Sequence, residues 1–189
     1  MSYGNNLSVV RAVGSTALNS SSKNGGSTRI QNSSEFADTL LNSDNNNSFG
    51  AFISRYPGAL GNSLTVSIID SSSNFAAWNV NNVMVSSYFN GAPGTSTQAS
   101  QAGAANDEVH IAIVDTGGLF TGVKNTVLET FSYLSKATDS TDSLGNSNYY
   151  RRKIFSNSKY VYSADHPDYA NTRLSWGQTF AAGGSFVTL

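Results

Sequence analysis

Two histidines are the side chains best suited to acid–base chemistry near neutral pH. His110 lies in an apolar run, Val109–Val114, and His166 stands between Asp165 and Pro167. A Ser-His-Asp site would need one of these rings beside a serine and a carboxylate. Serine is so abundant in this chain that any histidine has one nearby, so the pattern selects no nucleophile. We therefore expect His110 to be a packed or hydrogen-bonded strand residue and His166 a loop residue, with no catalytic residue and no enzymatic activity.

Two acidic stretches contain the kind of oxygen ligands that metal ions bind. Asp139–Gly145 is similar to a calcium loop, but its spacing does not give oxygen ligands at alternating positions, and a solvated turn fits better. Asp107 and Glu108 precede His110, and neighbouring strand residues point to opposite faces of a sheet. The sequence therefore predicts neither a metal ion nor a cofactor.

Composition excludes several other classes of function. The formal net charge is −1 and the sequence pI is about 6.0, so no basic field exists to hold a phosphate backbone. The chain has no cysteine, which excludes disulfides and thiolate zinc sites. It also has no glycine-rich phosphate motif, no Gly-x-Ser-x-Gly motif and no apolar run long enough to span a membrane. We expect neither nucleic acid nor a membrane as a partner.

Arg151, Arg152 and Lys153 form the one basic cluster. On a short helix such a cluster is most simply a solvated face, and its functional interpretation is a charge contact with a neighbouring subunit. The last third of the chain is also rich in aromatic residues, which are typical of core edges with a hydrated hydroxyl and, as an alternative, of stacking on a sugar. These residues are Tyr149, Tyr150, Tyr160, Tyr162, Tyr169 and Trp176.

The elements that must position these residues are mainly strands. Leu64–Ile69 alternates apolar and polar residues, and Val109–Val114 is apolar throughout, so we expect a half-buried strand and a central one. The remaining predicted strands are 7–13, 83–88, 127–134, 159–164, 173–180 and 185–188. Short helices are expected at 34–41, 49–53 and within 146–157. Strands joined by loops, with no βαβ pattern, predict a mainly β chain with a minor α+β character: a two-layer β-sandwich with a few short helices.

Two polar stretches are predicted to be loops. Residues 14–33 are dominated by Ser, Asn and Gly and are expected to be a linker with a turn at Asn24–Gly26. Residues 92–107 are rich in Ala, Gly, Gln and Thr and form the second predicted loop. We therefore expect one domain over residues 1–189, in which 14–50 is a linker and helix insertion.

Several segments together resemble a known family. Tyr3–Leu7 is followed by the β-branched run Val9–Val13, and Arg55–Leu64 contains Tyr-Pro-Gly followed by Leu-Gly-Asn. Asp107–Ile111 and Ser158–Tyr162 then follow in the same order. Over most of residues 1–13 and 50–189 the chain resembles the contractile tail sheath proteins of T-even phages.

This resemblance implies a middle β-sandwich domain of a sheath subunit, with a subtilisin-like inner domain beyond the C-terminus. The implied function is structural: subunits polymerise around the tail tube and contract to drive it through the host envelope. The implied partners are other sheath subunits, and the tube and baseplate through domains that lie outside this chain. The implied location is the virion, with assembly in the host cytoplasm, and the chain alone is expected to be monomeric.

The alternative from the same composition is a carbohydrate-binding or adhesin-type β-module. That function needs exposed aromatic and polar groups that converge on one concave site, which the sequence does not show.

Overall fold

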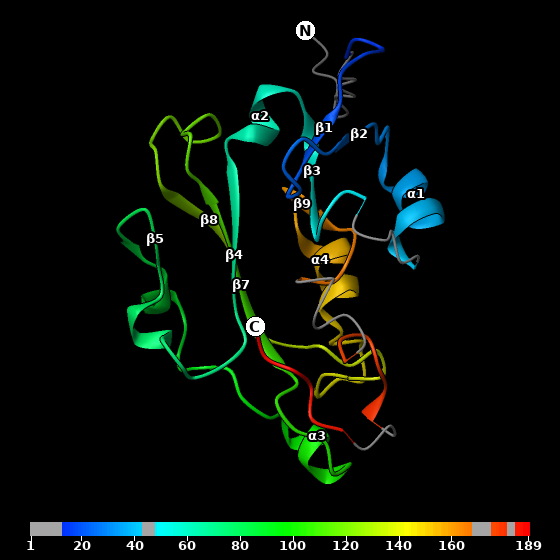
Figure 1. Ribbon diagram of the computed structural model, residues 1–189, viewed down its shortest axis with the longest axis vertical. Helices are drawn as coiled ribbons and strands as arrows, with labels where there is room; N and C mark the ends of the chain where they lie inside the picture. The colour runs from blue at the N-terminus through cyan, green and yellow to red at the C-terminus, as the bar shows by residue number, and fades with distance from the viewer. Residues whose placement is uncertain (1–12, 43–47, 168–174, 181–183) are drawn as a thin grey trace, which may run out of the picture.

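The computed structural model describes residues 13–42, 48–167, 175–180 and 184–189. The described chain has more strand than helix, with three antiparallel sheets and a few short helices (Figure 1). The prediction of a strand-rich chain with few short helices is thus confirmed at this level. The predicted strand at 7–13 lies outside the described residues except for Val13.

The three-stranded sheet is the one that the sequence predicts most directly. Its strands are β4 (Leu64–Ile69), β7 (Glu108–Asp115) and β8 (Thr126–Ser135), in the order β4-β7-β8. β7 is central, as expected, and its residues from Val109 to Asp115 are all buried. The long apolar run of β7 therefore reflects burial on both of its faces.

The four-stranded sheet contains a correction to the predicted linker. Its order is β2-β1-β3-β9, with β1 (Asn19–Ser21), β2 (Ser27–Thr28), β3 (Phe52–Pro57) and β9 (Val161–Ser163). β1 and β2 are a hairpin inside the stretch 14–50, so the prediction that 14–33 is only a linker is wrong. The serines are accepted because the hairpin lies at the outer edge of the sheet, and the buried Asn19 is accepted because its side chain donates to the Ser54 carbonyl oxygen and accepts from the Ile30 amide.

The predicted helix at 49–53 is also wrong, because this stretch enters β3. Phe52 packs in the core between the two larger sheets, whereas Ile53 packs on the opposite face of β3. A strand that is buried on both faces has no alternation, and its apolar run is easily taken for a short helix.

The first helix begins at Ser33, one residue before the stretch 34–41 in which it was predicted. The side chain of Asn32 accepts a hydrogen bond from the Glu35 amide, and α1 (Ser33–Phe36) continues into the π-type turn η1 (Ala37–Leu41). The other α-helices are α2 (Ala59–Asn62), α3 (Thr97–Gln101) and α4 (Tyr150–Asn157). The helix α3 lies within the stretch 92–107 that was predicted to be a loop.

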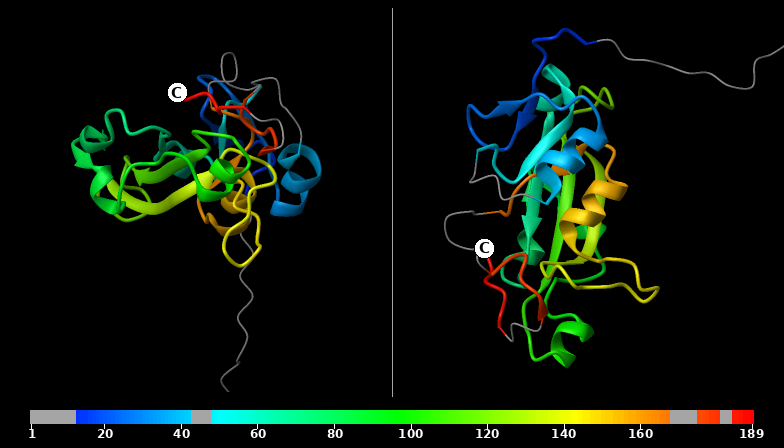
Figure 2. Two further views of the ribbon diagram at one scale, coloured as in Figure 1. Left: turned by 90° about the horizontal axis from the view of Figure 1, so that it is seen from below. Right: turned by 90° about the vertical axis from the view of Figure 1, so that its right-hand side faces the viewer.

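A small lobe forms between β4 and β7. It contains the turn η2 (Phe75–Ala77), the two-stranded sheet of β5 (Asn79–Val80) and β6 (Val83–Met84), and the turn η3 (Val85–Tyr88). The predicted strand 83–88 is thus a two-residue strand followed by a 3-10 turn. Viewed from below, this lobe and α1 lie at opposite ends of the molecule (Figure 2).

Three hydrophobic clusters join these layers. The largest lies between the two larger sheets and α4, where Ile111 and Ile113 of β7 meet Phe52, Val161 and Ile154. A second cluster packs α1 and η1 on the far face of the four-stranded sheet, and a third packs the small lobe on the far face of β7. Apolar side chains are therefore buried on both faces of β7 and on both faces of β3.

The C-terminal stretches predicted to be strands are not regular strands where they are described. Residues 175–177 form a turn, and Ser185 makes a single parallel bridge with Ala105. The segment is fixed instead by a buried ion pair, since Lys136 Nζ lies 2.8 Å from Asp70 and 3.2 Å from the Val187 carbonyl oxygen. Asp70 also accepts the Leu189 amide hydrogen, at 3.0 Å.

A buried carboxylate shapes the loop between β7 and β8. Asp115 is fully buried and accepts hydrogen bonds from the Ser63 hydroxyl and from four successive amides, Gly118 to Thr121. Burial opposes ionisation of Asp115, but the hydrogen bonds from Ser63, Thr121 and Phe120 outweigh it and lower the pKa to about 2. The charged carboxylate thus holds the loop in one conformation.

We expect Asp115→Asn to lower the free energy of unfolding at pH 7 by about 2 to 3 kcal/mol, because the amide accepts fewer of these bonds and carries no charge. The folded pKa lies below the ordinary value of 3.8, so this stabilisation is present above about pH 4 and is lost as the pH falls through about 2. Urea denaturation at a series of pH values measures the difference between the two proteins. Asp38→Asn, at an exposed position, serves as the control, and equal losses in both variants would contradict the assignment.

Candidate functional site

The predicted basic cluster lies on α4, but its three side chains have three different environments. α4 begins after Tyr149, which makes no side-chain capping bond, and buries Tyr150, Arg151 and Ile154. Residues three and four apart share a helix face, so Arg151 and Ile154 both point into the protein. The cluster is therefore not one solvated face.

Arg151 is a structural residue. Only 4% of it is exposed, and its Nη2 atom donates to the carbonyl oxygens of Leu40 at 2.9 Å and Ala164 at 3.0 Å. These bonds join α4 to η1 and to the segment after β9. The expectation of a solvated Arg151 is wrong, because the helix turns this side chain toward the core.

Lys153 and Arg152 differ in how their charges are used. Lys153 Nζ lies 3.0 Å from the carboxylate of Asp142, and this hydrogen bond, together with the Asn146 amide, lowers the pKa of Asp142. Arg152 is exposed and has no hydrogen-bond or ion-pair partner among the described residues. Of the three predicted contact residues, Arg152 is the one whose charge is available to a partner.

Arg152 stands between two surface hollows. The first, which we call the α4 hollow, has a volume of about 470 Å³, and the second, beside α4, has about 540 Å³. Leu41 and Arg152 line both of them. The described residues that line the α4 hollow are Leu41, Asn42, Thr138, Tyr149, Arg151, Arg152, His166, Trp176, Gly177 and Gln178.

His166 forms an inner wall of the α4 hollow. The ring is buried, and its Nδ1 atom lies 2.5 Å from the Tyr150 hydroxyl, whose pKa is raised well above its usual value by burial. Gly177 has a φ of +80°, and a Cβ atom there would lie 2.8 Å from His166 Nε2. The turn that carries Trp176 approaches the imidazole this closely because residue 177 has no side chain.

His110 has the packed environment that the sequence predicts. Its Nδ1 accepts the Tyr133 amide hydrogen and its Nε2 hydrogen-bonds to the Gly91 carbonyl oxygen, each at 2.9 Å. The ring stacks on Phe89 at 4.6 Å between centroids, and burial lowers its pKa. Both ring nitrogens are used, so His110 supports the fold rather than proton transfer.

The aromatic residues of the C-terminal third mostly belong to the core. Tyr149, Tyr150, Tyr162 and Trp176 are buried. Tyr160 is half-buried, and Tyr169 lies outside the described residues. Tyr149 and Trp176 both pack in the core and line the α4 hollow, but only 7% and 2% of them are exposed.

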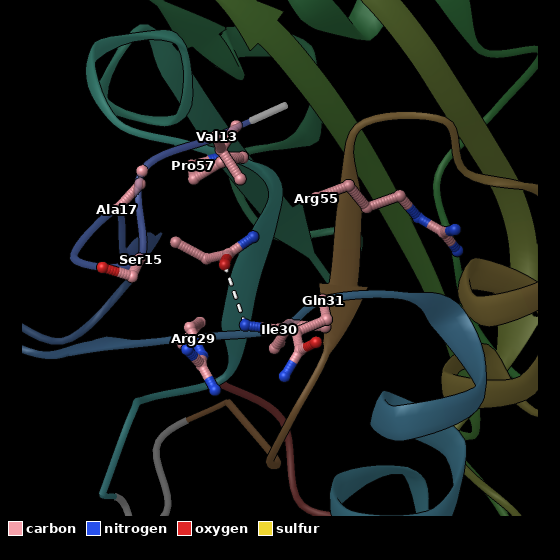
Figure 3. A pocket seen from close by; sticks show the side chains of 10 residues that line it. Val13, Ser15, Ala17, Arg29, Ile30, Gln31, Arg55 and Pro57 are labelled. Atoms are coloured by element: carbon pink, nitrogen blue, oxygen red, sulfur yellow. Dashed lines mark hydrogen bonds between the residues drawn. The ribbon is translucent and has the colours of Figure 1, made fainter. Parts of the chain in front are cut away.

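A second basic hollow, of about 440 Å³, lies near the start of the described chain (Figure 3). Its floor includes the hydrogen bond from the Ile30 amide to Asn19 Oδ1, at 3.0 Å. Arg55 points away from the other labelled side chains and donates to the carbonyl oxygens of Val161 and Phe155, and burial lowers its pKa. Arg29 is thus the exposed arginine of this hollow.

The free edge of β4 borders an apolar space. β4 pairs with β7 along all six of its residues, and no strand pairs with its other edge in the described part of the chain. Beside it lies a space of about 260 Å³, which we call the β4 slot. It is lined by Leu64, Val66 and Ile68 of β4, by Ser20–Ser22, Ala51, Phe52, Ser54 and Val161 of the facing sheet and its flanks, and by Gly61.

The sequence pointed to Arg152 but not to the α4 hollow or the β4 slot. The walls of both spaces come from residues that are far apart in the chain, so no local motif describes them. One local signal existed for the slot, because Leu64–Ile69 contains no charge and no proline. An edge strand of this kind lacks the usual protection against pairing with another chain.

The described residues contain no group of three or more His, Cys, Asp or Glu that could hold a metal ion. Within the same residues, none of the helices has the length and apolar character needed to cross a membrane. No protein-family model, curated protein or solved structure matches this chain.

The same substitution should affect stability very differently at the two arginines of α4. Arg151→Gln removes the bonds from this buried guanidinium to the carbonyl groups of Leu40 and Ala164 and should lower the free energy of unfolding by about 2 to 4 kcal/mol. Arg152→Gln changes an exposed side chain and should alter it by less than about 0.5 kcal/mol. Urea denaturation followed by circular dichroism measures both values, and a large loss for Arg152→Gln would contradict the assigned roles.

Proposed function

We propose that this chain is a structural domain of a virion, a β-sandwich of the contractile tail sheath. In this proposal the four-stranded and three-stranded sheets are the two layers of the sandwich. The full-length subunits polymerise around the tail tube and contract to drive it through the host envelope. An inner domain that follows this one, outside the present chain, makes the contacts to the tube and to the baseplate.

The observation that carries the proposal is the unprotected edge of β4. Monomeric β-proteins normally protect an outer strand with charges, proline, a bulge or a covering segment. β4 has six residues, no charge, no proline and no register shift against β7, and it borders the apolar β4 slot. Such an edge is suited to contact with another chain, as expected of a protein that works by assembly.

The core supports a mechanical role. β7 is buried on both faces, and the largest cluster joins both larger sheets to α4. Close-packed interiors have low compressibility and transmit strain. A domain built in this way moves as one body when interfaces between subunits rearrange.

The resemblance to tail sheath proteins is the reason for proposing this particular assembly. The stretch Arg55–Leu64, which contributes most to it, spans the end of β3, the helix α2 and the start of β4. Gly58 has a φ of +75°, which glycine adopts without steric cost, and it precedes α2. The Tyr-Pro-Gly segment thus lies where the chain leaves one sheet for the other.

Electron microscopy tests the proposed assembly. The protein extended beyond Leu189 through the proposed inner domain should form long hollow tubes in negative stain, whereas the 189-residue chain should form no tubes. If the extended protein does not assemble even when tail tubes are supplied, the sheath proposal is wrong.

A charge placed in the β4 slot should weaken assembly. In the extended protein, Val66→Lys puts an ammonium group beside the free edge of β4, and we expect tubes to be at least tenfold less abundant at equal protein concentration. Thr130→Lys, at an exposed position of β8 in the same sheet, is the matched control and should leave tube formation unchanged. Thermal unfolding of both variants checks the fold, and normal tubes from Val66→Lys would exclude β4 as an assembly surface.

A further inference from the structure

We propose that Lys136 and Asp70 form an intramolecular isopeptide bond, an amide between the lysine amine and the aspartate carboxyl group. The bond joins the ends of two strands of the three-stranded sheet and releases one water molecule. Because the chain has no cysteine, a covalent cross-link within it has to use other side chains. This inference goes beyond the proposed assembly function and does not depend on it.

The fold brings these two residues together at one end of the three-stranded sheet. Asp70 directly follows β4, and Lys136 directly follows β8. Both strands pair with β7 in the antiparallel sense, so they run in the same direction and finish at the same end of the sheet (Figure 1). The two side chains meet there, with Lys136 Nζ 2.8 Å from Asp70 Oδ2. A bond between them therefore ties the two outer strands of the sheet to each other.

The pair is removed from water. No part of the Lys136 side chain and only 3% of the Asp70 side chain is exposed. Lys136 Nζ also lies 4.8 Å from the centre of the Trp176 ring and donates to the Val187 carbonyl oxygen at 3.2 Å. Burial lowers the pKa of Lys136 against the opposing effects of Asp70 and Asp107, and a buried lysine that loses its proton is a nucleophile.

Both reacting groups are held in place before they react. The Lys136 amide donates to the Asp107 carbonyl oxygen at 2.7 Å, and the Lys136 carbonyl oxygen accepts from the Gly177 amide at 2.9 Å. On the other side, the Leu189 amide nitrogen lies 3.2 Å from Oδ1 and 3.0 Å from Oδ2 of Asp70. Groups that are fixed at contact distance react far faster than the same groups free in solution, because little translational and rotational freedom remains to be lost.

Asp107 is the other buried carboxylate near Lys136, but its oxygen atoms are already used. Oδ1 accepts from the Ser96 amide at 2.7 Å, and Oδ2 accepts from the hydroxyl groups of Ser96 and Ser135 at 2.9 and 2.7 Å. Within the described part of the chain, the ammonium group of Lys136 forms its ion pair with Asp70. Asp70 is therefore the carboxyl group that the amine meets.

The reaction is a condensation that needs no co-reactant. Transfer of one proton from the Lys136 ammonium to the Asp70 carboxylate gives a neutral amine and a neutral carboxylic acid, which a site without water favours. The amine nitrogen attacks Cγ of Asp70, and the Leu189 amide donates to the oxygen that becomes negative. A second proton then passes from nitrogen to the hydroxyl group, the Cγ–O bond breaks, and water leaves as the Nζ–Cγ amide forms. No atom is oxidised or reduced, and two buried charges are removed.

The bond closes a loop from Asp70 to Lys136 that contains β7, α3 and the small lobe. A cross-link of this kind stabilises a fold mainly by restricting the unfolded chain. When the two ends of the chain are pulled apart, residues 71–135 cannot be extended, because the force passes through the bond. The central strand β7 is thereby protected from mechanical unfolding.

The intact mass of the 189-residue chain, purified in its folded form and then denatured, tests the proposal. Mass spectrometry should find the chain lighter by one water molecule than the mass of its sequence, with or without Met1. A proteolytic digest should contain a peptide with Asp70 joined to a peptide with Lys136, and fragmentation of this product should place the junction at these two residues. A chain that has the full mass of its sequence would overturn the proposal, and so would a water loss that maps to other residues.

Two matched variants assign the reaction. Lys136→Arg keeps a positive charge beside Asp70 but removes the amine, so it should have the full mass of its sequence. Lys153→Arg changes the more exposed ion pair with Asp142, in which Nζ and Oδ2 are 3.0 Å apart, and this variant should still lose water. Circular dichroism checks that both variants fold. A water loss that persists in Lys136→Arg contradicts the assignment, and if this variant does not fold, the mass and the digest of the unaltered chain decide.

Discussion

Strand β7 is buried along seven consecutive residues, from Val109 to Asp115, and each of the larger layers packs against it. Ile111 and Ile113 face the core shared with the four-stranded sheet and α4, while Ala112 and His110 face the small lobe. β7 pairs with β4 on one side and with β8 on the other, so β7 has no free edge. A cavity in this strand would therefore loosen both sheets and the lobe together, because close-packed neighbours relax only partly around a lost side chain.

Buried charges fix the loops at both ends of this core. Asp115 organises the loop after β7, and Asp107 accepts hydrogen bonds from Ser96 and Ser135 just before it. Lys136 and Asp70 fix the C-terminal segment in a similar way, since a buried ion pair is stable only when its remaining hydrogen-bonding capacity is used. Only 12% of this chain is charged, so each charge placed inside leaves fewer on the surface. The uncharged edge of β4 is consistent with this distribution.

The sequence predicted the strands whose apolar pattern follows directly from which of their faces are buried. β4 alternates and β7 is uniformly apolar, so periodicity identified both. It failed where tertiary contacts override local preference. The hairpin β1–β2 is polar and reads as a linker, because its strands are formed by pairing with β3 rather than by their own apolar pattern. Phe52 and Ile53 read as a helix because a strand buried on both faces has no alternation. The same limit applies to the basic cluster, since the rotation of α4 that buries Arg151 and exposes Arg152 depends on Leu40 and Ala164, which are distant in the sequence.

The α4 hollow and the β4 slot both border the largest hydrophobic cluster. Tyr149 and Trp176 belong to the largest cluster and line the hollow, while Phe52 and Val161 belong to the same cluster and line the slot. Because a close-packed core deforms little, the distance between these two surfaces is fixed by side-chain volumes rather than by a flexible linker.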